Sequence, residues 1–390
     1  MKPGLRQSPP LGGKRAQQLP IGQAPVDRIA LPGQIVLVLQ GGGALGAFQL
    51  GVYEALHEAG IEPDWVVGTS IGAINGAIIA GNPPDARMDK LHEFWDRMGH
   101  CDGLSLPSLF PPLTDALANF NVLTLGIAGF FEPNPVAFFG WHAPVGIERA
   151  SYYSTAPLRR TLSTLIDFDR LHNNRTRLTV GAVNAATGAM RYFDSRDEAI
   201  SVDHVMASGA LPPAFPAIRI DGQPYWDGGI YSNTPSEVVL ADNPRRDSVI
   251  FVVNLWSAQG GEPSSIWEVA GRQKDIQYAS RVTSHILKEQ QIHKLRHIIR
   301  ELVKRMPASL REQPDVQELN SWGCGTVQHL VRLLAPRLAW EDHTKDIDFS
   351  SGGIEARWKA GYACTRRALR AAPWERTVDP RDGVLIYEVD

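Results

Sequence analysis

The sequence has few cysteines and no long apolar run, and each shortage excludes a class of protein. Cysteine occurs three times in 390 residues, and Cys101, Cys324 and Cys364 are far apart in the sequence. This number and spacing argue against a disulfide framework or a zinc cluster and fit a reducing compartment. Because no stretch of about 18 apolar residues occurs, no helix is expected to span a bilayer. We therefore expect a cytoplasmic protein.

An excess of charge of one sign is also missing. The formal net charge is −3, so no strong field attracts the chain to nucleic acid or to an anionic membrane. Residues 1–33 hold no apolar core long enough for a signal peptide, and they are rich in proline and glycine. We expect a disordered leader there. Its basic residues could touch a membrane surface transiently but are too few for stable anchoring.

The length suits one large α/β domain with an appendage. After the leader we predict a main domain at residues 34–260 and a mainly helical extension at 261–390. Within the main domain, residues 100–150 are rich in proline, phenylalanine and leucine and poor in charge. This stretch predicts either an irregular insert packed on the core or an apolar lid beside a binding site.

The first part of the main domain alternates short apolar runs with amphipathic helix patterns. Residues 34–39 and 64–70 predict buried strands, while 45–59 and 71–81 predict helices. A β-α-β-α unit of this kind implies a largely parallel sheet covered by helices.

The rest of the chain predicts further elements and no internal repeat. The charged residues of a long helix at 264–305 are interpreted as its solvated side, with a membrane or partner surface as the alternative. Its apolar face would consist of Ile276, Val282, Ile286, Ile292, Leu295, Ile299 and Leu302. The other predicted elements are a helix at 156–171, a hairpin at 177–195 turning at Thr187–Gly188, a strand at 249–257, a helix at 354–371 and a strand at 383–389.

A glycine loop, "GGGALG" at residues 41–46, lies between the first strand and the first helix. Exposed N–H groups at such a loop favour bound negative charge, which could belong to a dinucleotide or to the oxyanion of a reacting ester. A dinucleotide site also needs an acidic residue at the end of the second strand. Here Asp64 stands at the start of that strand, which disfavours a dehydrogenase.

The end of the second strand instead carries "GTSIG", a G-x-S-x-G pattern in which Gly68 and Gly72 flank Ser70. Small residues allow the sharp strand-to-helix turn that exposes a nucleophilic serine. The ends of neighbouring parallel strands meet at one sheet edge, so the glycine-loop amides could face an acyl group attacked by Ser70. We assign the oxyanion hole to Gly41, Gly42, Gly43 and Ile71, with Gly46 as motif support.

The serine also needs a base. A Ser-His-Asp arrangement is one possibility, with His285, His293, His297, His329 and His343 as candidates. The middle three lie in polar helical sequence and are expected to be surface residues.

The alternative base is Asp227 in "YWDGGIYSNTP", which follows a short strand. Gly228 and Gly229 would let the backbone pass close to another element, although Asp-Gly is also a common turn without further function. The preceding residues 207–216 are suited to lining a pocket, and "SNTP" predicts a helix start capped by Asn233 or Thr234.

Together "GGGALG", "GTSIG" and "DGG" resemble the patatin-like phospholipase family over residues 35–257. The resemblance implies a three-layer α/β/α sandwich with a mostly parallel sheet, and a Ser-Asp dyad that hydrolyses fatty-acyl esters without histidine. It makes Ser70 the nucleophile, Asp227 the general base and the Gly41–Gly43 loop the oxyanion hole. The C-terminal region is similar to a bacterial subgroup with an added C-terminal domain. Leu45 stands where the family loop usually has arginine or lysine. Both phospholipids and neutral esters stay candidate substrates, and a neutral ester is the more natural one if that cation serves the oxyanion or a substrate phosphate.

The sequence therefore predicts a serine lipid acyl hydrolase, of phospholipase A, lysophospholipase or acylglycerol esterase type, that works through an acyl-enzyme. Its partner would be a lipid or fatty-acyl ester, and the apolar stretch at 100–150 would be an acyl-chain wall. This dyad requires no cofactor and no metal, and the sequence has no calcium loop. The alternatives are a Ser-His-Asp esterase and a non-catalytic lipid-binding scaffold.

Overall fold

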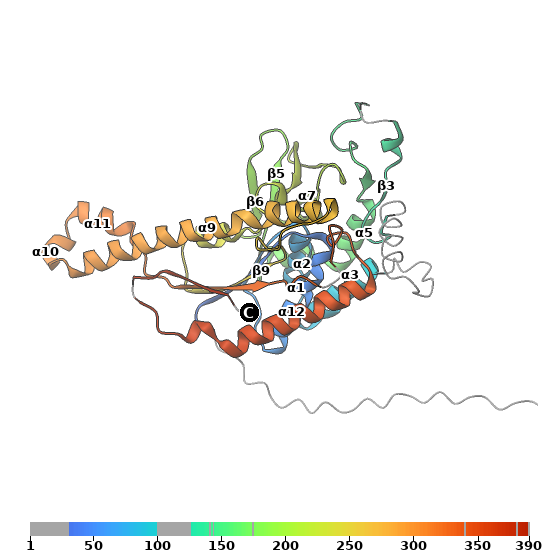
Figure 1. The fold of residues 1–390 in the computed structure, drawn as a ribbon. Coiled ribbons are helices and arrows are strands. Elements are labelled where there is room, and N and C mark those ends of the chain that lie inside the picture. The colour runs from blue at the N-terminus through green and yellow to red at the C-terminus, as the bar shows by residue number, and fades with distance from the viewer. Residues whose placement is uncertain are drawn as a thin grey trace, which may run out of the picture.

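A nine-stranded, mostly parallel sheet organises the chain in the order β11-β10-β9-β1-β2-β5-β8-β7, with β6 paired to β5 (Figure 1). This architecture comes from a computed structural model that describes residues 31–99, 126–139, 142, 144–173, 175–338, 341–379 and 381–388. The predicted leader at 1–33 lies almost entirely outside these ranges. Residues 100–125 of the apolar insert also lie outside them.

The predicted β-α-β-α unit is confirmed. It consists of β1 (Gln34–Leu39), α1 (Ala47–Glu58), β2 (Trp65–Thr69) and α2 (Ile71–Ala80). A 3-10 turn at Gly43–Gly46 precedes α1, so the helix begins slightly later than its apolar pattern suggests. Strand β1 lies in the middle of the sheet, where it pairs in parallel with β2 and β9.

The segment predicted as one helix at 156–171 is two helices. Helix α5 (Ala156–Leu165) ends where Ile166 adopts an extended backbone conformation. The carboxylate of Asp167 then caps α6 (Phe168–His172) by accepting a hydrogen bond from the Arg170 N–H. A local capping interaction therefore interrupts an apolar period that continues through it.

The predicted hairpin is confirmed as β5 (Arg177–Asn184) and β6 (Met190–Asp194), which pair antiparallel. The predicted helix cap after Asp227 is wrong, because α8 starts at Ser236 with Pro235 before it. The remaining elements up to residue 254 are α3 (Pro84–Gly99), β3 (Glu132–Pro133), β4 (Tyr153–Ser154), α7 (Val202–Ser208), β7 (Ile218–Ile220), β8 (Gln223–Asp227), α8 (Ser236–Leu240) and β9 (Ser248–Asn254).

The two faces of the sheet have separate cores, which gives the predicted three layers. Alternate residues of β1 point to opposite faces, as the strand geometry requires. Leu37 and Leu39 belong to the core that includes α1, α2, α3 and α12. Val36 and Val38 belong to the second core, with α8 and α9 packed on it.

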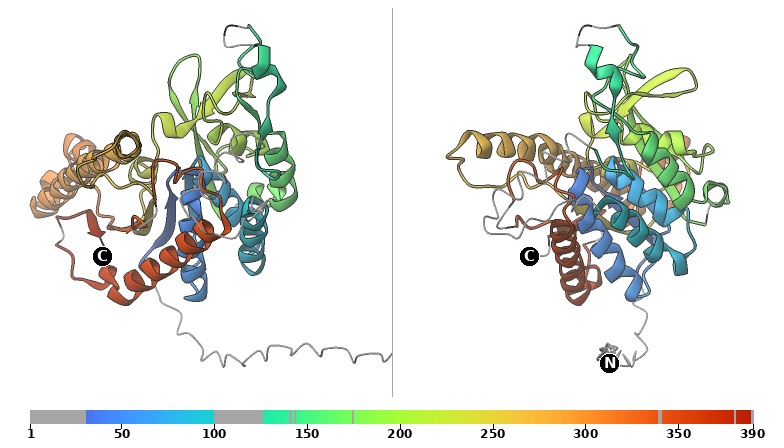
Figure 2. Two further views of the ribbon diagram at one scale, coloured as in Figure 1. Left: turned by 45° about the vertical axis from the view of Figure 1, so that its right-hand side comes forward. Right: turned by 90° about the vertical axis from the view of Figure 1, so that its right-hand side faces the viewer.

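Residues 261–390 are mostly helical, as predicted, but they also extend the central sheet. They form α9 (Ile266–Arg305), α10 (Ala308–Arg311), α11 (Pro314–Ser321), β10 (Gln328–Leu334), α12 (Ser351–Ala371) and β11 (Val384–Glu388). Strand β10 pairs in parallel with both β9 and β11. Helix α12 lies along α1 (Figure 2). At their contact, Gly361 packs against the Phe48 carbonyl with no room for a Cβ.

The apolar face predicted for the long helix is only partly buried. Ile286 is buried, whereas the side chains of Ile276, Leu295 and Leu302 are 48%, 62% and 57% exposed. The reason is that the buried face of α9 instead carries Ile286, His293, His297 and Val303, and the three exposed side chains lie outside that face. Figure 1 shows that α9 carries α10 and α11 at its far end. Among the described residues, no helix combines the length and the apolar character needed to cross a membrane.

Candidate active site

Ser70 stands between the end of β2 and the start of α2, at the turn that the "GTSIG" pattern predicts. Its backbone has a φ of 56° and a ψ of −127°, a conformation that residues other than glycine rarely adopt. The flanking glycines make this turn feasible. A Cβ at Gly72 would collide with the Leu39 carbonyl, and a Cβ at Gly68 would collide with the backbone of Gly72.

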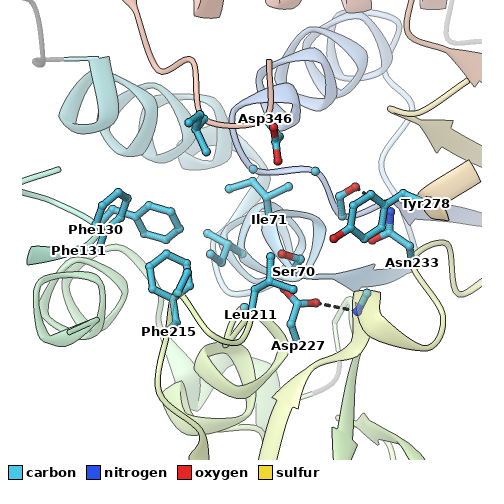
Figure 3. A pocket seen from close by; sticks show the side chains of 18 of the residues that line it. Ser70, Ile71, Phe130, Phe131, Leu211, Phe215, Asp227, Asn233, Tyr278 and Asp346 are labelled. Atoms are coloured by element: carbon cyan, nitrogen blue, oxygen red, sulfur yellow. Dashed lines mark hydrogen bonds between the residues drawn. The ribbon is translucent and has the colours of Figure 1, made fainter. Parts of the chain in front are cut away.

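Asp227 reaches the same sheet edge through the register of β5. Thr69 of β2 pairs with Gly181 of β5, and the next residue of β5, Ala182, pairs with Asp227 of β8. Ser70 and Asp227 therefore follow one another along the same edge of β5, because β6 pairs with its other edge, and both line one cavity (Figure 3). Gly228 allows this close passage, because a Cβ there would collide with the Gly181 carbonyl.

The carboxylate of Asp227 is enclosed, since the residue is 1% exposed. Burial raises the pKa of Asp227 to about 7, while hydrogen bonding with the Ser70 side chain and with the Gly229 N–H opposes that rise. The Gly229 N–H donates to Asp227 Oδ1 at 2.7 Å. The result is a carboxyl group that gains or loses its proton near neutral pH, in contact with a serine.

The glycine loop is held firmly at its first residue. The Gly41 N–H donates to the Asn233 carbonyl at 3.1 Å. The Gly41 carbonyl accepts from Asn233 Nδ2 at 3.0 Å and from Trp256 Nε1 at 2.8 Å. Asn233, predicted as a helix cap, therefore holds this loop instead, and the Gly41 amide already has an acceptor.

The next amides along the loop face the cavity without such a partner. Within the described residues, no acceptor engages the N–H groups of Gly42 and Gly43, and both glycines line the cavity. The N–H of Ile71 lies in the first turn of α2, where an α-helix leaves its amides without intrahelical acceptors. These three amides border the same space as Ser70.

The cavity has a volume of about 180 Å³, with a mainly apolar wall. In Figure 3, Phe130, Phe131 and Phe215 gather on one side of Ser70, whereas Tyr278 and Asn233 lie on the other. The three phenylalanine rings contact one another with centroid separations of 5.4 to 5.7 Å. The described part of the apolar insert and the 207–216 segment thus both line the cavity, which agrees with the lining expected of 207–216 and favours the apolar-wall alternative for the insert.

Four lining residues come from the C-terminal segment, and sequence reasoning missed all of them. They are Tyr278 of α9 and, from the loop before α12, Asp346, Ile347 and Phe349. The last three lie in residues 346–369, the segment that resembles the added C-terminal domain, but that resemblance gives them no role, and all four are far from Ser70 in the sequence. Only the fold brings them to the cavity.

No histidine is among the described residues that line the cavity. The expectation that the middle three candidates are surface residues is wrong, because His293, His297 and His329 are 1%, 3% and 5% exposed. His293 and His297 bond through Nε2 to the carbonyls of Leu240 and Thr326, respectively, both at 2.9 Å. His329 belongs to strand β10, not to a helix. Their polar neighbours in sequence conceal a face of α9 that packs on the sheet.

Leu45 does not border this cavity. It is 3% exposed and lies with Phe48, Leu255 and Arg357 around a small separate space. Within the described ranges, no group of three or more histidine, cysteine, aspartate or glutamate side chains could hold a metal ion.

Comparison with known families shows which family this chain belongs to. A family model described as patatin-like phospholipase matches residues 37–240, which include the glycine loop, Ser70 and Asp227. The chain belongs to the patatin-like phospholipase family. A second model, described as patatin phospholipase, matches residues 276–381. The resemblance carried by the three motifs is therefore confirmed, and the C-terminal segment also has patatin-associated relatives.

Patatin-like relatives are similar to this chain over short segments. Lysophospholipase nte1 of Aspergillus terreus is 44% identical over 79 residues, which are 20% of this chain and 5% of that protein. Patatin-like phospholipase domain-containing protein 6 of Homo sapiens is 38% identical over 88 residues, or 23% of this chain and 6% of that protein. The chain thus spans only a small part of the length of these relatives.

Two solved structures are similar to this patatin-like chain at low identity. VipD of Legionella pneumophila has a TM-score of 0.39 and 16% identity, with 88% of this chain and 67% of that chain covered. The ExoU-SpcU complex of Pseudomonas aeruginosa has a TM-score of 0.25 and 19% identity, with 74% of this chain and 59% of that chain covered. Both TM-scores are below 0.5, and neither structure bears on the site.

Proposed function

We propose that this protein is a serine lipid acyl hydrolase in which Ser70 is the nucleophile and Asp227 the general base. One observation carries the proposal: a buried carboxyl with a pKa of about 7 contacts a serine in a strained turn, at an apolar cavity. A general base works best when its pKa is near the operating pH. An ordinary exposed aspartate, with a pKa near 4, would be too weak a base for a hydroxyl.

The reaction would proceed in two halves. Ser70 Oγ attacks the acyl carbonyl carbon while its proton passes to the Asp227 carboxylate. The tetrahedral intermediate collapses, the C–O bond to the alcohol breaks, and that alcohol takes the proton from Asp227. Water then attacks the acyl-enzyme and gives a proton to Asp227. Collapse of the second intermediate releases the fatty acid, and the proton returns to Ser70.

The oxyanion would be stabilised by the N–H groups of Gly42, Gly43 and Ile71. Donors fixed around the developing charge commonly contribute more to catalysis than any other single feature. Gly41 is better understood as a support for this loop, because its own N–H is donated to the Asn233 carbonyl. The positive end of α2 would further favour negative charge at Ser70.

The substrate would be a fatty-acyl ester, and a neutral ester rather than a phospholipid. The phenylalanine wall suits an acyl chain, because burying apolar surface is favourable. The described lining contains two carboxylates, Asp227 and Asp346, and no lysine or arginine. A phosphate placed near the ester would therefore find no cationic side chain in this lining to pair with, since Lys274 is already paired with Asp346. Turnover of a monoacylglycerol and of a lysophospholipid with the same acyl chain tests this preference directly.

The decisive experiment is labelling with a fluorophosphonate probe together with turnover of a short-chain ester. Wild type should react, whereas Ser70→Ala should not be labelled and Asp227→Asn should lose nearly all turnover. Asp197→Asn, at a side chain that is 64% exposed, is the matched acid-to-amide control. Labelling of the Ser70→Ala variant to the same extent as wild type would exclude Ser70 as the nucleophile. Full turnover by Asp227→Asn would favour a histidine base instead.

A lipid substrate also implies transient contact with a lipid surface, which the same probe can test. Labelling that appears only with detergent micelles would indicate that a lipid interface opens the cavity. Absence of labelling with and without micelles, in a protein that unfolds cooperatively, would favour the non-catalytic lipid-binding scaffold.

A further inference from the structure

A loop of the C-terminal segment determines the shape of the glycine loop. The Asp346 carbonyl accepts a hydrogen bond from the Ala44 N–H at 2.9 Å. The same carbonyl approaches Gly43 so closely that a Cβ would collide with it, and Gly43 has a φ of 55°. Figure 3 shows Asp346 and Asp227 on opposite sides of Ser70. Residue 346 therefore fixes the end of the loop that carries the Gly42 and Gly43 amides.

Asp346 is in turn held by Lys274 of α9. Lys274 Nζ donates to the two carboxylate oxygens of Asp346 at 2.8 and 2.9 Å, and to the His343 carbonyl at 3.1 Å. These contacts use all three N–H donors of an ammonium group. Lys274 therefore ties α9 to the loop before α12 at the residue that touches the glycine loop.

The same ammonium group balances the charge beside the cavity. The Asp346 side chain is 22% exposed, so water screens its charge only partly. Without Lys274 this carboxylate would be unpaired beside the amides proposed to receive the oxyanion. Negative charge develops there in the transition state but is absent from a neutral ester, so an unpaired Asp346 would raise the activation barrier without weakening ground-state binding.

We propose that Lys274 is a positioning residue for ester hydrolysis, which acts through Asp346 to hold the Gly43–Ala44 turn and to neutralise the Asp346 carboxylate. The inference rests on the function proposed above. It gives the C-terminal segment a definite role, because the oxyanion side of the site is completed by α9 and the loop before α12. The catalytic groups themselves remain in the first 230 residues.

Other contacts brace this loop, so loss of Lys274 alone should leave the protein folded. Lys345 Nζ donates to Asp275 Oδ1 at 2.6 Å, which is a second tie to α9. Arg357 of α12 donates to the Asp348 carbonyl at 2.8 Å and to its carboxylate at 3.1 Å. Catalytic effects of Lys274 can therefore be separated from unfolding.

The test measures kcat and KM of the full chain with a neutral p-nitrophenyl butyrate substrate. Lys274→Met should lower kcat about tenfold with KM changed less than about twofold. Lys274→Arg should recover most of the loss, because a guanidinium can still pair with the carboxylate. The double variant Lys274→Met/Asp346→Asn should be faster than Lys274→Met, since it leaves no unpaired charge. Lys294→Met removes another α9 lysine, paired with Asp382 at 3.4 Å, and should match wild type.

Three results would overturn the inference. They are a Lys274→Met kcat within about twofold of wild type, an equal loss in Lys294→Met, and a double variant no faster than the single one. Thermal unfolding of each variant shows whether a loss reflects structure alone. If wild type neither turns over the ester nor reacts with the fluorophosphonate, the proposed function fails and the role of Lys274 fails with it. An active wild type with an unaffected Lys274→Met removes only the positioning role.

Discussion

The buried hydroxyl of Ser208 accepts a hydrogen bond from the main-chain N–H of Ser70 at 3.1 Å. The same hydroxyl donates to the Gly181 carbonyl at 2.7 Å. One side chain of α7 thus satisfies backbone groups of two neighbouring strands at the strained turn. This contact fixes the backbone of the proposed nucleophile independently of Asp227.

Ser208→Ala should therefore destabilise the protein and slow the probe reaction. Losing both hydrogen bonds to these backbone groups should cost about 1 to 3 kcal/mol. Urea unfolding measures the stability, and the labelling rate of Ser70 measures the effect on the turn. Ser257→Ala, at an exposed serine, is the control. Unchanged stability and labelling would mean that water replaces the lost hydroxyl.

The pH dependence of turnover should report the buried carboxyl. Because Asp227 must be deprotonated to accept the Ser70 proton, kcat/KM should rise with pH and level off above an inflection near 7, the value to which burial raises the pKa of Asp227. Initial rates between pH 5 and 9 with a neutral ester test this expectation. An inflection near 4 would indicate a hydrated carboxylate.

Asp227→Asn should stabilise the protein more at pH 8 than at pH 5. The pKa of this carboxyl is about 7 when folded and 3.8 when unfolded, so between these values the folded state binds a proton that the unfolded state lacks. Stability from Asp227 is therefore fully present below pH 4 and is lost as the pH rises to 7. Because asparagine does not titrate, the Asp227→Asn variant does not lose this contribution as the pH rises.

The advantage of the Asn variant should grow by on the order of 2 to 3 kcal/mol from pH 5 to pH 8. Urea unfolding of both proteins at the two pH values measures it, with Asp197→Asn as the control. An equal difference at both pH values would contradict a carboxyl pKa raised by burial.

Phe215→Ala should lower activity on long-chain esters more than on short ones. Phe215 contacts Phe130 and Phe131 in the cavity wall. Its removal therefore takes away apolar wall surface that a long acyl chain would contact and that a short acyl group would not reach. A loss of about tenfold in the ratio of kcat/KM for decanoate and acetate esters is expected. Tyr152→Ala removes an aromatic side chain that does not line the cavity. An equal loss on both esters would reduce the wall to a structural element.

Replacing the histidines should leave the chemistry intact. His293→Ala would orphan the buried Leu240 carbonyl and lower stability by about 1 to 3 kcal/mol. Its kcat, measured where the variant is folded, should stay within about twofold of wild type. The kcat of His285→Ala should also stay within about twofold of wild type, since His285 borders a different pocket together with the 229–234 loop. Loss of labelling in either variant would restore the Ser-His-Asp alternative.

Local patterns were sufficient to predict much of the fold. The apolar run at 34–39 matches β1, and the small-residue helix after Ser70 matches α2, because each signal is set by near neighbours. Such patterns could not reveal that β10 and β11 extend the central sheet, since the sequence of a short buried strand does not indicate which strand it pairs with. They also could not show which face of α9 packs inward, the face that buries His293 and leaves Leu295 exposed.

In the candidate site, too, residues set by local sequence were predictable and residues brought in by the fold were not. Ser70, Asp227 and the glycine loop were recognisable because tight turns restrict residue types strongly. Ser208, Tyr278 and Asp346 could not be recognised, because a carbonyl or hydroxyl contact places no demand on neighbouring sequence. The Gly41 assignment illustrates the difference. A glycine motif indicates where a chain can pass closely, but only its contacts distinguish a support from a donor to the substrate.

The contact between Asp346 and the glycine loop can form only late in the synthesis of residues 1–346. Gly43 leaves the ribosome roughly 300 residues before the aspartate that shapes its turn. At typical translation rates that interval is roughly 15 to 60 s. Strand β1 also waits, because one of its neighbours in the sheet is β9. A growing chain thus contains Ser70 and Asp227 before the Asp346 carbonyl can hold its glycine loop, so ester hydrolysis at the full rate would require synthesis to pass residue 346.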